Sequence, residues 1–145
     1  MYKKTITYVD YNDEKCTEDC YFNLKPSEIV EMKATGNDLA SKLQEMIDKK
    51  DGALIMKTIK DIVLASYGEK TADGKHFMKK DENGRPLSAL FEQSEAYSVL
   101  FMELCSDPEE AVKFISGVLP ISDDQRREIL TQAKEATAEL PANAN

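Results

Sequence analysis

The fold is decided by an N-terminal stretch that reads Thr5-Ile6-Thr7-Tyr8-Val9-Asp10, then Asn12-Asp13-Glu14, then Cys16-Thr17-Glu18-Asp19-Cys20-Tyr21-Phe22-Asn23-Leu24. Successive side chains of a β-strand point to opposite faces, so the alternation of apolar and polar residues predicts strands at residues 5–10 and 16–24. The polar residues between them predict a turn, and therefore an antiparallel hairpin. A three-residue loop would place Ile6 opposite Cys20 and Tyr8 opposite Glu18.

The apolar side chains of the two predicted strands share one face of the hairpin. The first strand contributes Ile6 and Tyr8, and the second contributes Cys16, Cys20, Phe22 and Leu24. A lone hairpin with one apolar face is at best marginally stable in water. Helices from the rest of the chain are therefore expected to cover that face.

Helix signals fill most of the remaining chain. A short helix begins at Pro26 and is broken by Thr35-Gly36-Asn37. Further helices are expected at residues 38–49; at residues 51–68, capped by Asp51 and ended by Gly68; at residues 87–105, either as one helix or as two divided at Ser94; and after the start signal Asp107-Pro108-Glu109-Glu110. The polar interval 69–86 contains residues 75–78, which fit either a short strand or an ordered loop. The predicted fold class is α+β and mostly helical, with an N-terminal β-hairpin packed on five to six helices.

The helical pattern also predicts the core. We expect near-complete burial of one set of apolar side chains, with Phe22 and Leu24 of the hairpin packed on them: Ile59, Ile62, Val63, Leu100, Phe101 and Leu104.

The C-terminal segment differs from the rest of the chain. Residues 122–139 favour a helix, with a capping pattern in Ser122 and Gln125. The apolar face of this helix consists only of Ile129, Leu130, Ala133 and Ala136, which is too thin to hold it firmly. The predicted division is therefore a hairpin-plus-helices domain at residues 1–121 and a loosely attached C-terminal helix and tail at residues 122–145, with residues 140–145 frayed.

Composition restricts the class of protein. The 145 residues are 41% hydrophobic and 32% charged, which is typical of a globular domain, and the net charge is −8. An acidic chain is not a default nucleic-acid binder, because phosphate contacts require a positive face. Neither a membrane-spanning run nor a signal peptide is evident, and the three cysteines fit a reducing compartment. A cytoplasmic location is therefore expected.

A search for catalytic or metal-binding patterns favours none. Cys16 and Cys20 would lie roughly 13 Å apart along an extended strand, too far for a disulfide, and are best explained as core residues. His76 lies in a polar loop without a neighbouring nucleophile and orienting carboxylate. The segment from Asp81 to Pro86 breaks the spacing of a calcium-binding loop. We therefore expect no catalytic residue, no cofactor and no metal site, and we expect that the protein is not an enzyme.

Several short sequence motifs resemble tail assembly chaperones of long-tailed phages and prophages of Gram-positive bacteria. The resemblance covers about residues 1–120. It rests on Tyr2-Lys3-Lys4-Thr5-Ile6-Thr7-Tyr8, Tyr21-Phe22-Asn23-Leu24, Tyr67-Gly68-Glu69-Lys70 with Asp73-Gly74-Lys75 and Phe77, Glu95-Ala96-Tyr97-Ser98, and Leu100-Phe101-Met102-Glu103-Leu104.

The resemblance implies a non-enzymatic protein of the bacterial host cytoplasm that assists tail morphogenesis. Its implied partners are the tape measure protein, a long helical polypeptide, and the major tail (tube) protein. In this family the C-terminal region leads towards a longer form that engages the tape measure protein. Ile129, Leu130 and Ala133 are therefore the expected contacts to a partner or to a second copy of the chain. The alternative is a small acidic adaptor or regulatory protein with an unrelated partner, and an unrecognised enzyme ranks third.

Overall fold

The computed structural model describes residues 1–138, with side chains as far as residue 135. Seven helices and one four-stranded antiparallel sheet, in the order β1-β2-β3-β4, make up this part of the chain and confirm the mostly helical α+β class. In chain order the elements are β1 (Tyr2–Val9), β2 (Lys15–Phe22), α1 (Pro26–Ala34), α2 (Leu39–Lys49), α3 (Gly52–Ser66), β3 (Tyr67–Lys70), β4 (Phe77–Met78), α4 (Leu87–Glu92), α5 (Glu95–Ser106), α6 (Pro108–Val118) and α7 (Asp123–Ala138). The predicted frayed residues 140–145, Glu139 and the side chain of Ala136 lie outside the described part.

The hairpin has the predicted faces but a different register. Ile6 lies opposite Glu18 and Tyr8 opposite Cys16, so the predicted pairing of Ile6 with Cys20 is wrong. The reason is that the turn is centred on Asn12, one residue earlier than predicted, in a connection over residues 10–14 where the Asp10 carboxylate accepts hydrogen bonds from the backbone N–H groups of Asn12 and Glu14. Because the shift is by two residues, no side chain changes face. Ile6, Cys20 and Phe22 are buried as predicted.

Side-chain caps begin the later helices where the sequence predicts them. Asp51 accepts from the N–H of Ala53, and Asp107 accepts from those of Glu109 and Glu110. Ser94 accepts from the N–H of Tyr97 and so separates α4 from α5. Ser122 and Gln125 exchange hydrogen bonds at the start of α7. These local signals satisfy N–H groups that a helix start leaves without partners.

The end of α3 differs from the prediction. The helix stops at Ser66, and Gly68 is a buried strand residue instead of a helix terminator. A Cβ at position 68 would lie 2.5 Å from a ring carbon of Phe77 and 2.7 Å from the carbonyl oxygen of Met78. Glycine is therefore required for the close approach of β3 and β4. Of the two alternatives for residues 75–78, the structure confirms the short strand.

The core joins the hairpin to the helices through Phe22, which is fully buried. Its ring lies within 5.2–6.4 Å of four others, measured between ring centroids: Tyr2, Tyr67, Phe91 and Phe114. The predicted burial of Ile59, Ile62, Val63, Leu100 and Leu104 is confirmed.

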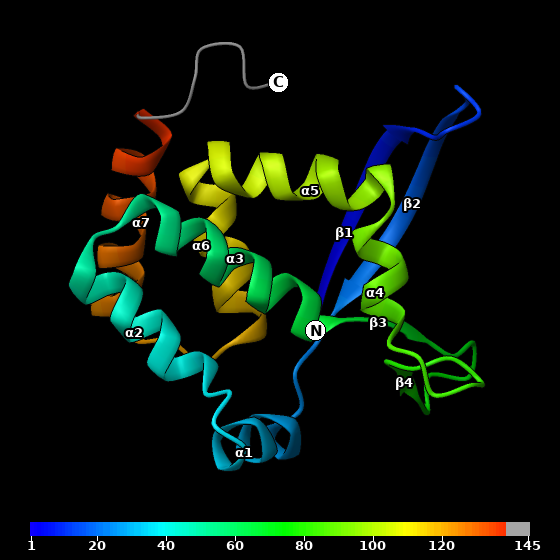
Figure 1. Ribbon diagram of the computed structural model, residues 1–145, viewed down its shortest axis with the longest axis horizontal. Helices are drawn as coiled ribbons and strands as arrows, with labels where there is room; N and C mark the ends of the chain where they lie inside the picture. The colour runs from blue at the N-terminus through cyan, green and yellow to red at the C-terminus, as the bar shows by residue number, and fades with distance from the viewer. Residues whose placement is uncertain (139–145) are drawn as a thin grey trace.

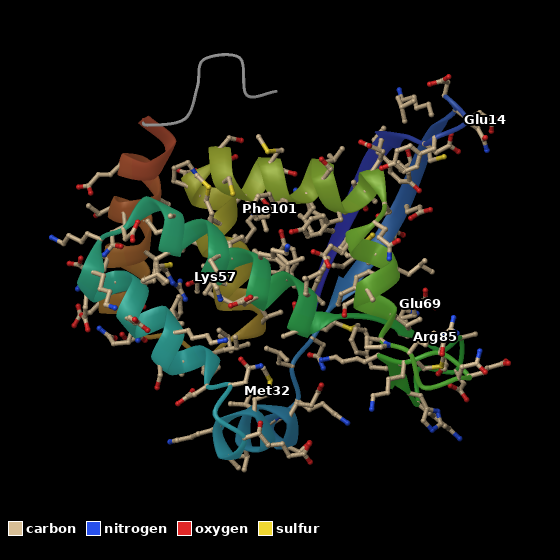
Figure 2. All side chains as sticks on the ribbon, in the orientation of Figure 1. Glu14, Met32, Lys57, Glu69, Arg85 and Phe101 are labelled. Atoms are coloured by element: carbon tan, nitrogen blue, oxygen red, sulfur yellow. The ribbon has the colours of Figure 1, made fainter. Side chains whose placement is uncertain are left out.

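The predicted burial of Phe101 is wrong. The interior face of α5 is formed by Ala96, Leu100 and Leu104, each four residues from the next. Phe101 lies to one side of that face, is only half-buried and stacks on Tyr97, with 5.7 Å between the ring centroids (Figure 2).

The hairpin runs along one flank of the helices, and its turn, marked by Glu14, extends beyond α4 and α5 (Figures 1 and 2). Its first strand is tied to the helices by Lys4, whose ammonium lies 2.7 Å from a carboxylate oxygen of Glu103 in α5 and 3.3 Å from one of Glu110 in α6. In the part of β2 nearest the turn, residues 15 and 17–19 are exposed to solvent.

Candidate partner-binding surface

The three predicted contact residues all lie on α7, but they do not form an exposed patch. Ile129 and Ala133 are buried, and Leu130 is half-buried against the same core. The helix packs most extensively against α6 and also contacts α2, α3 and α5. A partner can reach Ile129 and Ala133 only if α7 moves away from these helices.

The interface between α7 and the other helices includes a buried side-chain amide. Gln132 is 2% exposed, and its Nε2 donates a hydrogen bond to the carbonyl oxygen of Ile47 in the last turn of α2. Its Oε1 has no hydrogen-bond partner within residues 1–138. A buried acceptor without a partner costs about 1–3 kcal/mol. Burial of Ile129 is therefore offset in part by Gln132, and the firmness with which α7 is held stays a prediction.

The polar residues considered for chemistry lie apart from one another. His76 is exposed in the loop between β3 and β4, Cys20 is buried and Cys16 is half-buried with its thiol 3.4 Å from the Asp10 carboxylate. Burial raises the pKa of the Cys20 thiol to about 11, so this thiol is protonated at neutral pH. Among residues 1–138, no three His, Cys, Asp or Glu side chains are grouped so that they could hold a metal ion.

The sequence did not reveal an open sheet edge on β2. Only Tyr21 and Phe22 of this strand pair with β3, opposite Gly68 and Tyr67. Beyond Tyr21 the chain of β3 diverges, and Glu69 and Lys70 pair with β4 instead. Residues 15–19 of β2 therefore have a strand partner, β1, on one side only within the described structure.

The backbone directions along β2 define which groups the open edge presents. The N–H of Asn23 donates to Ser66 on the β3 side, whereas Asp10 and Glu14 are hydrogen-bonded across the hairpin. Backbone groups alternate in direction along a strand, so the odd-numbered residues of β2 point to the β3 side. Lys15, Thr17 and Asp19 accordingly present their N–H and C=O groups at the open edge.

Two adjoining hollows border this edge. The larger, about 480 Å³, lies where β2 and β3 separate and is lined by residues 18–21 and 67–70. The smaller, about 180 Å³, lies between the distal hairpin and α4 and is lined by Tyr8, Glu18, Tyr67, Glu69, Leu87, Leu90, Phe91 and Ser94. The two hollows adjoin at Glu18, Tyr67 and Glu69, which line both. We call the two hollows together the β2-edge groove.

The β2-edge groove combines acidic groups with apolar surface. Leu90 is 72% exposed, which makes it the most exposed large aliphatic residue in the described part of the chain. Tyr8 donates a 2.6 Å hydrogen bond to Glu18, and this bond raises the pKa of Tyr8 far above its ordinary value of 10.0. Burial raises the pKa of Tyr67 to about 12. Both tyrosines are therefore neutral at physiological pH, and the negative charge of the groove comes from its carboxylates.

Leu90 was the only available sequence signal for this groove. The pattern at residues 87–91 places Leu87, Leu90 and Phe91 on one apolar stripe, but a helix as short as α4 buries only Phe91 fully. The divergence of β3 from β2 depends on Gly68 and β4, which are remote from Leu90 in the sequence. Local patterns do not contain that information.

Comparison with known proteins assigns the chain to a family. Within the described residues, no helix is both long enough and apolar enough to cross a lipid bilayer. No curated protein and no solved structure matches the chain. A family model described as "Phage tail assembly chaperone" matches residues 1–144. Because this match covers nearly the whole length, the chain belongs to the phage tail assembly chaperone family.

Proposed function

We propose that this chain binds the tape measure protein, the major tail (tube) protein, or both, in the cytoplasm of the bacterial host, and that it acts by binding and not by catalysis. The observation that carries the proposal is the family match over residues 1–144. The acidic character supports it, because a net charge of −8 keeps a carrier soluble while it covers apolar surface on its client.

The physical task of such a carrier is to shield an amphipathic chain before assembly. A long helical polypeptide with an apolar stripe aggregates unless the stripe is covered. Binding has to be reversible, because tube subunits must replace the carrier around the tape measure protein. A modest contact area fits that requirement better than a large apolar interface.

The role of Ile129, Leu130 and Ala133 in partner contact is part of this proposal. Since Ile129 and Ala133 are buried, contact with a partner requires that α7 separates from the other helices before or during binding. The unpartnered Oε1 of Gln132 supports such a step, because release of α7 would allow water to hydrate that atom.

Co-expression tests the proposal. The tagged chain is produced with the tape measure protein or with the tube protein of the same phage, and soluble fractions are analysed by affinity purification and size-exclusion chromatography. We expect the tape measure protein to become soluble and to co-elute with the chain, and to be released when tube protein is added. Failure of both proteins to co-elute would favour the alternative of an acidic adaptor with an unrelated partner.

A variant pair tests the part played by α7. Leu130→Ser removes a half-buried apolar side chain of α7, whereas Thr131→Ser alters an exposed neighbour and serves as the control. We expect Leu130→Ser to weaken co-elution and Thr131→Ser to leave it unchanged. Equal co-elution of both variants would remove α7 from the proposed contact.

A further inference from the structure

We propose that the β2-edge groove binds an extended segment of a partner protein, which adds to the sheet as a strand beside residues 15–19 and carries an apolar side chain flanked by lysine or arginine. The identity of the partner as a tail protein rests on the proposed function; the chemistry of the segment rests on the groove alone.

The backbone supplies the main attraction. Thr17 and Asp19 present N–H and C=O groups on the side where β3 has diverged. They lie on the same edge of β2 as Tyr21 and Phe22, the residues that pair with β3. An added strand can continue the hydrogen-bonding pattern that β3 begins. Strand addition of this kind obtains affinity from main-chain hydrogen bonds and specificity from pockets for alternate side chains.

The smaller hollow provides one such pocket. The even-numbered side chains of β2 face the helices, and beside Glu18 on that face lies the hollow of about 180 Å³ with Leu87, Leu90 and Phe91 in its lining. Alternate side chains of an added strand would point to the same face. An apolar side chain there would cover Leu90, whose exposure is otherwise unexplained.

The charges select the residues around that apolar side chain. Glu18, Asp19 and Glu69 line the groove, and Lys70 is the single basic residue in its lining. The Asp19 carboxylate is already paired with Lys3, at 3.5 Å, so the excess of negative charge rests on Glu18 and Glu69 against Lys70. This excess favours lysine or arginine in the bound segment.

The same charges disfavour a second copy of the chain as the occupant. In an antiparallel pairing of two β2 edges about Thr17, Lys15 of each copy would lie opposite Asp19 of the other, so the ladder itself would not be repulsive. Residues 15–19 nevertheless carry a net charge of −1, and a groove with an excess of negative charge favours a basic segment over this acidic one. We therefore assign the groove to a basic segment of another protein.

The test uses the full-length ¹⁵N-labelled chain and two kinds of probe. One probe is a synthetic peptide, Thr-Lys-Val-Leu-Val-Lys-Thr, with a matched peptide in which both lysines are replaced by glutamate. The other is a set of overlapping ten-residue peptides from the tape measure and tube proteins. We expect the lysine peptide to shift the amide signals of Thr17 and Asp19, the glutamate peptide to have little effect, and the tail-protein peptides that bind to contain lysine or arginine beside an apolar residue.

Two variants and one control locate the binding. Leu90→Ser removes the apolar pocket wall without changing the charge, and Thr17→Pro removes an N–H from the open edge. Thr17→Pro also removes the hydroxyl contact with Thr7 but leaves the backbone hydrogen bonds to β1 in place. Val30→Ser is the control, because Val30 is 67% exposed on α1 and does not line the groove. We expect Leu90→Ser to weaken peptide binding at least about tenfold and Val30→Ser to leave it unchanged.

Equal binding by Leu90→Ser and Val30→Ser, or peptide-induced shifts confined to other elements, would overturn the inference. So would a dimer in sedimentation velocity that Thr17→Pro dissociates, because the edge would then belong to a second copy. Co-elution of intact tail proteins with Leu90→Ser at the wild-type level would overturn the inference while the proposed function stands. Binding of the lysine peptide without any tail-protein co-elution would overturn the proposed function while the inference about the groove stands.

Discussion

A single lysine connects three parts of the fold. The Lys79 ammonium donates to the carbonyl oxygens of Asn23 and Ala65, at 2.7 and 2.9 Å, and to the Glu28 carboxylate at 2.6 Å. Burial lowers the pKa of Lys79 below its ordinary 10.5, and the hydrogen bond and charge of Glu28 oppose that shift. Lys79 thereby holds the loop after β4 against the link that precedes α1, the first turn of α1 and the last turn of α3.

Replacing Lys79 tests this connection. Lys79→Met keeps the length of the side chain but leaves Glu28 and two carbonyl groups without their donor, so we expect a loss of about 1–3 kcal/mol in the free energy of unfolding. The double variant Lys79→Met, Glu28→Gln should recover part of that loss, because no unpaired carboxylate remains and the glutamine oxygen can still accept from the N–H of Lys25. Urea unfolding measures both, with the exposed Lys75→Met as the control. A loss no larger than that of Lys75→Met would contradict the role of Lys79.

A second prediction at the scale of residues concerns how the contact between Lys4 and Glu110 contributes to stability at different pH. Burial by itself would raise the pKa of Glu110, but hydrogen bonds from Tyr2, Lys113 and Lys4 outweigh it and hold this pKa below 4.5. The contribution of Glu110 to stability is therefore present above pH 4.5 and is lost as the pH falls through its lowered pKa. Burial by itself would lower the pKa of Lys4, but Glu103 and Glu110 raise it above 10.5. The contribution of Lys4 to stability is therefore present below pH 10.5 and is lost as the pH rises through its raised pKa.

We therefore expect Lys4→Met to lower the free energy of unfolding by about 1 kcal/mol at pH 7. The difference from wild type should shrink as the pH falls through the lowered pKa of Glu110, because the carboxylate that pairs with Lys4 is then protonated. Lys113→Met is the matched control, since Lys113 contacts the same carboxylate from an exposed position and should have a smaller effect. A difference that is constant between pH 3 and pH 7 would show that Lys4 acts through packing and not through charge.

At the scale of elements, the sequence predicted what depends on neighbouring residues. The hairpin faces, the cap residues Asp51, Asp107 and Ser122, and the division at Ser94 follow from alternation and capping chemistry within a few positions. The hairpin register depends on the residue at which the turn is centred, and the hydrogen bonds accepted by Asp10 stabilise the turn at that position. The strand β3, the open edge of β2 and the burial of α7 depend on contacts between distant segments, and local patterns do not specify these.

Gly68 allows a test of the sheet. Gly68→Ala places a methyl group against the Phe77 ring and the backbone of Met78, so we expect a loss of about 1–3 kcal/mol, measured by thermal unfolding. Glu69→Ala, at an exposed position of the same strand, is the control and should cost little. Full stability of Gly68→Ala would show that β3 and β4 separate easily.

The attachment of α7 is best measured by amide exchange. We predict that the amide of Ile129 exchanges faster than that of Ile59, because α7 combines a narrow apolar face with the unpartnered Oε1 of Gln132 whereas α3 is packed on the core along its length. Deletion of residues 122–145 should then leave a folded protein. Equal protection of Ile129 and Ile59 would mean that α7 belongs to the core and that the division after Ile121 fails.

At the scale of the whole molecule, the hairpin and the helices depend on one another through Phe22. Its ring meets rings from β1, β3, α4 and α6, so neither part can lose its structure without uncovering the other. The sequence predicted that the helices would cover the hairpin, because the apolar face of the hairpin requires a cover. It did not show that the cover would stop short of the distal part of β2.

Phe22→Ala should therefore lower the free energy of unfolding by about 3–5 kcal/mol, whereas the half-buried Phe101→Ala should cost about 1–2 kcal/mol. Tyrosine fluorescence and helical circular dichroism should report the same transition in each variant, because hairpin and core helices unfold together. Loss of the tyrosine signal at lower urea than the helical signal would instead show that the hairpin unfolds independently.

The contacts that secure the hairpin also determine when the protein can complete its fold during synthesis. The Tyr2 hydroxyl donates to Glu110, 108 positions later in the chain, and the Phe114 ring packs against both Tyr2 and Phe22. The hairpin leaves the ribosome before α6, so part of its apolar face has no cover until α6 has been translated and released. During that interval this chaperone displays an unprotected apolar surface, the same condition that it is proposed to relieve in its partner.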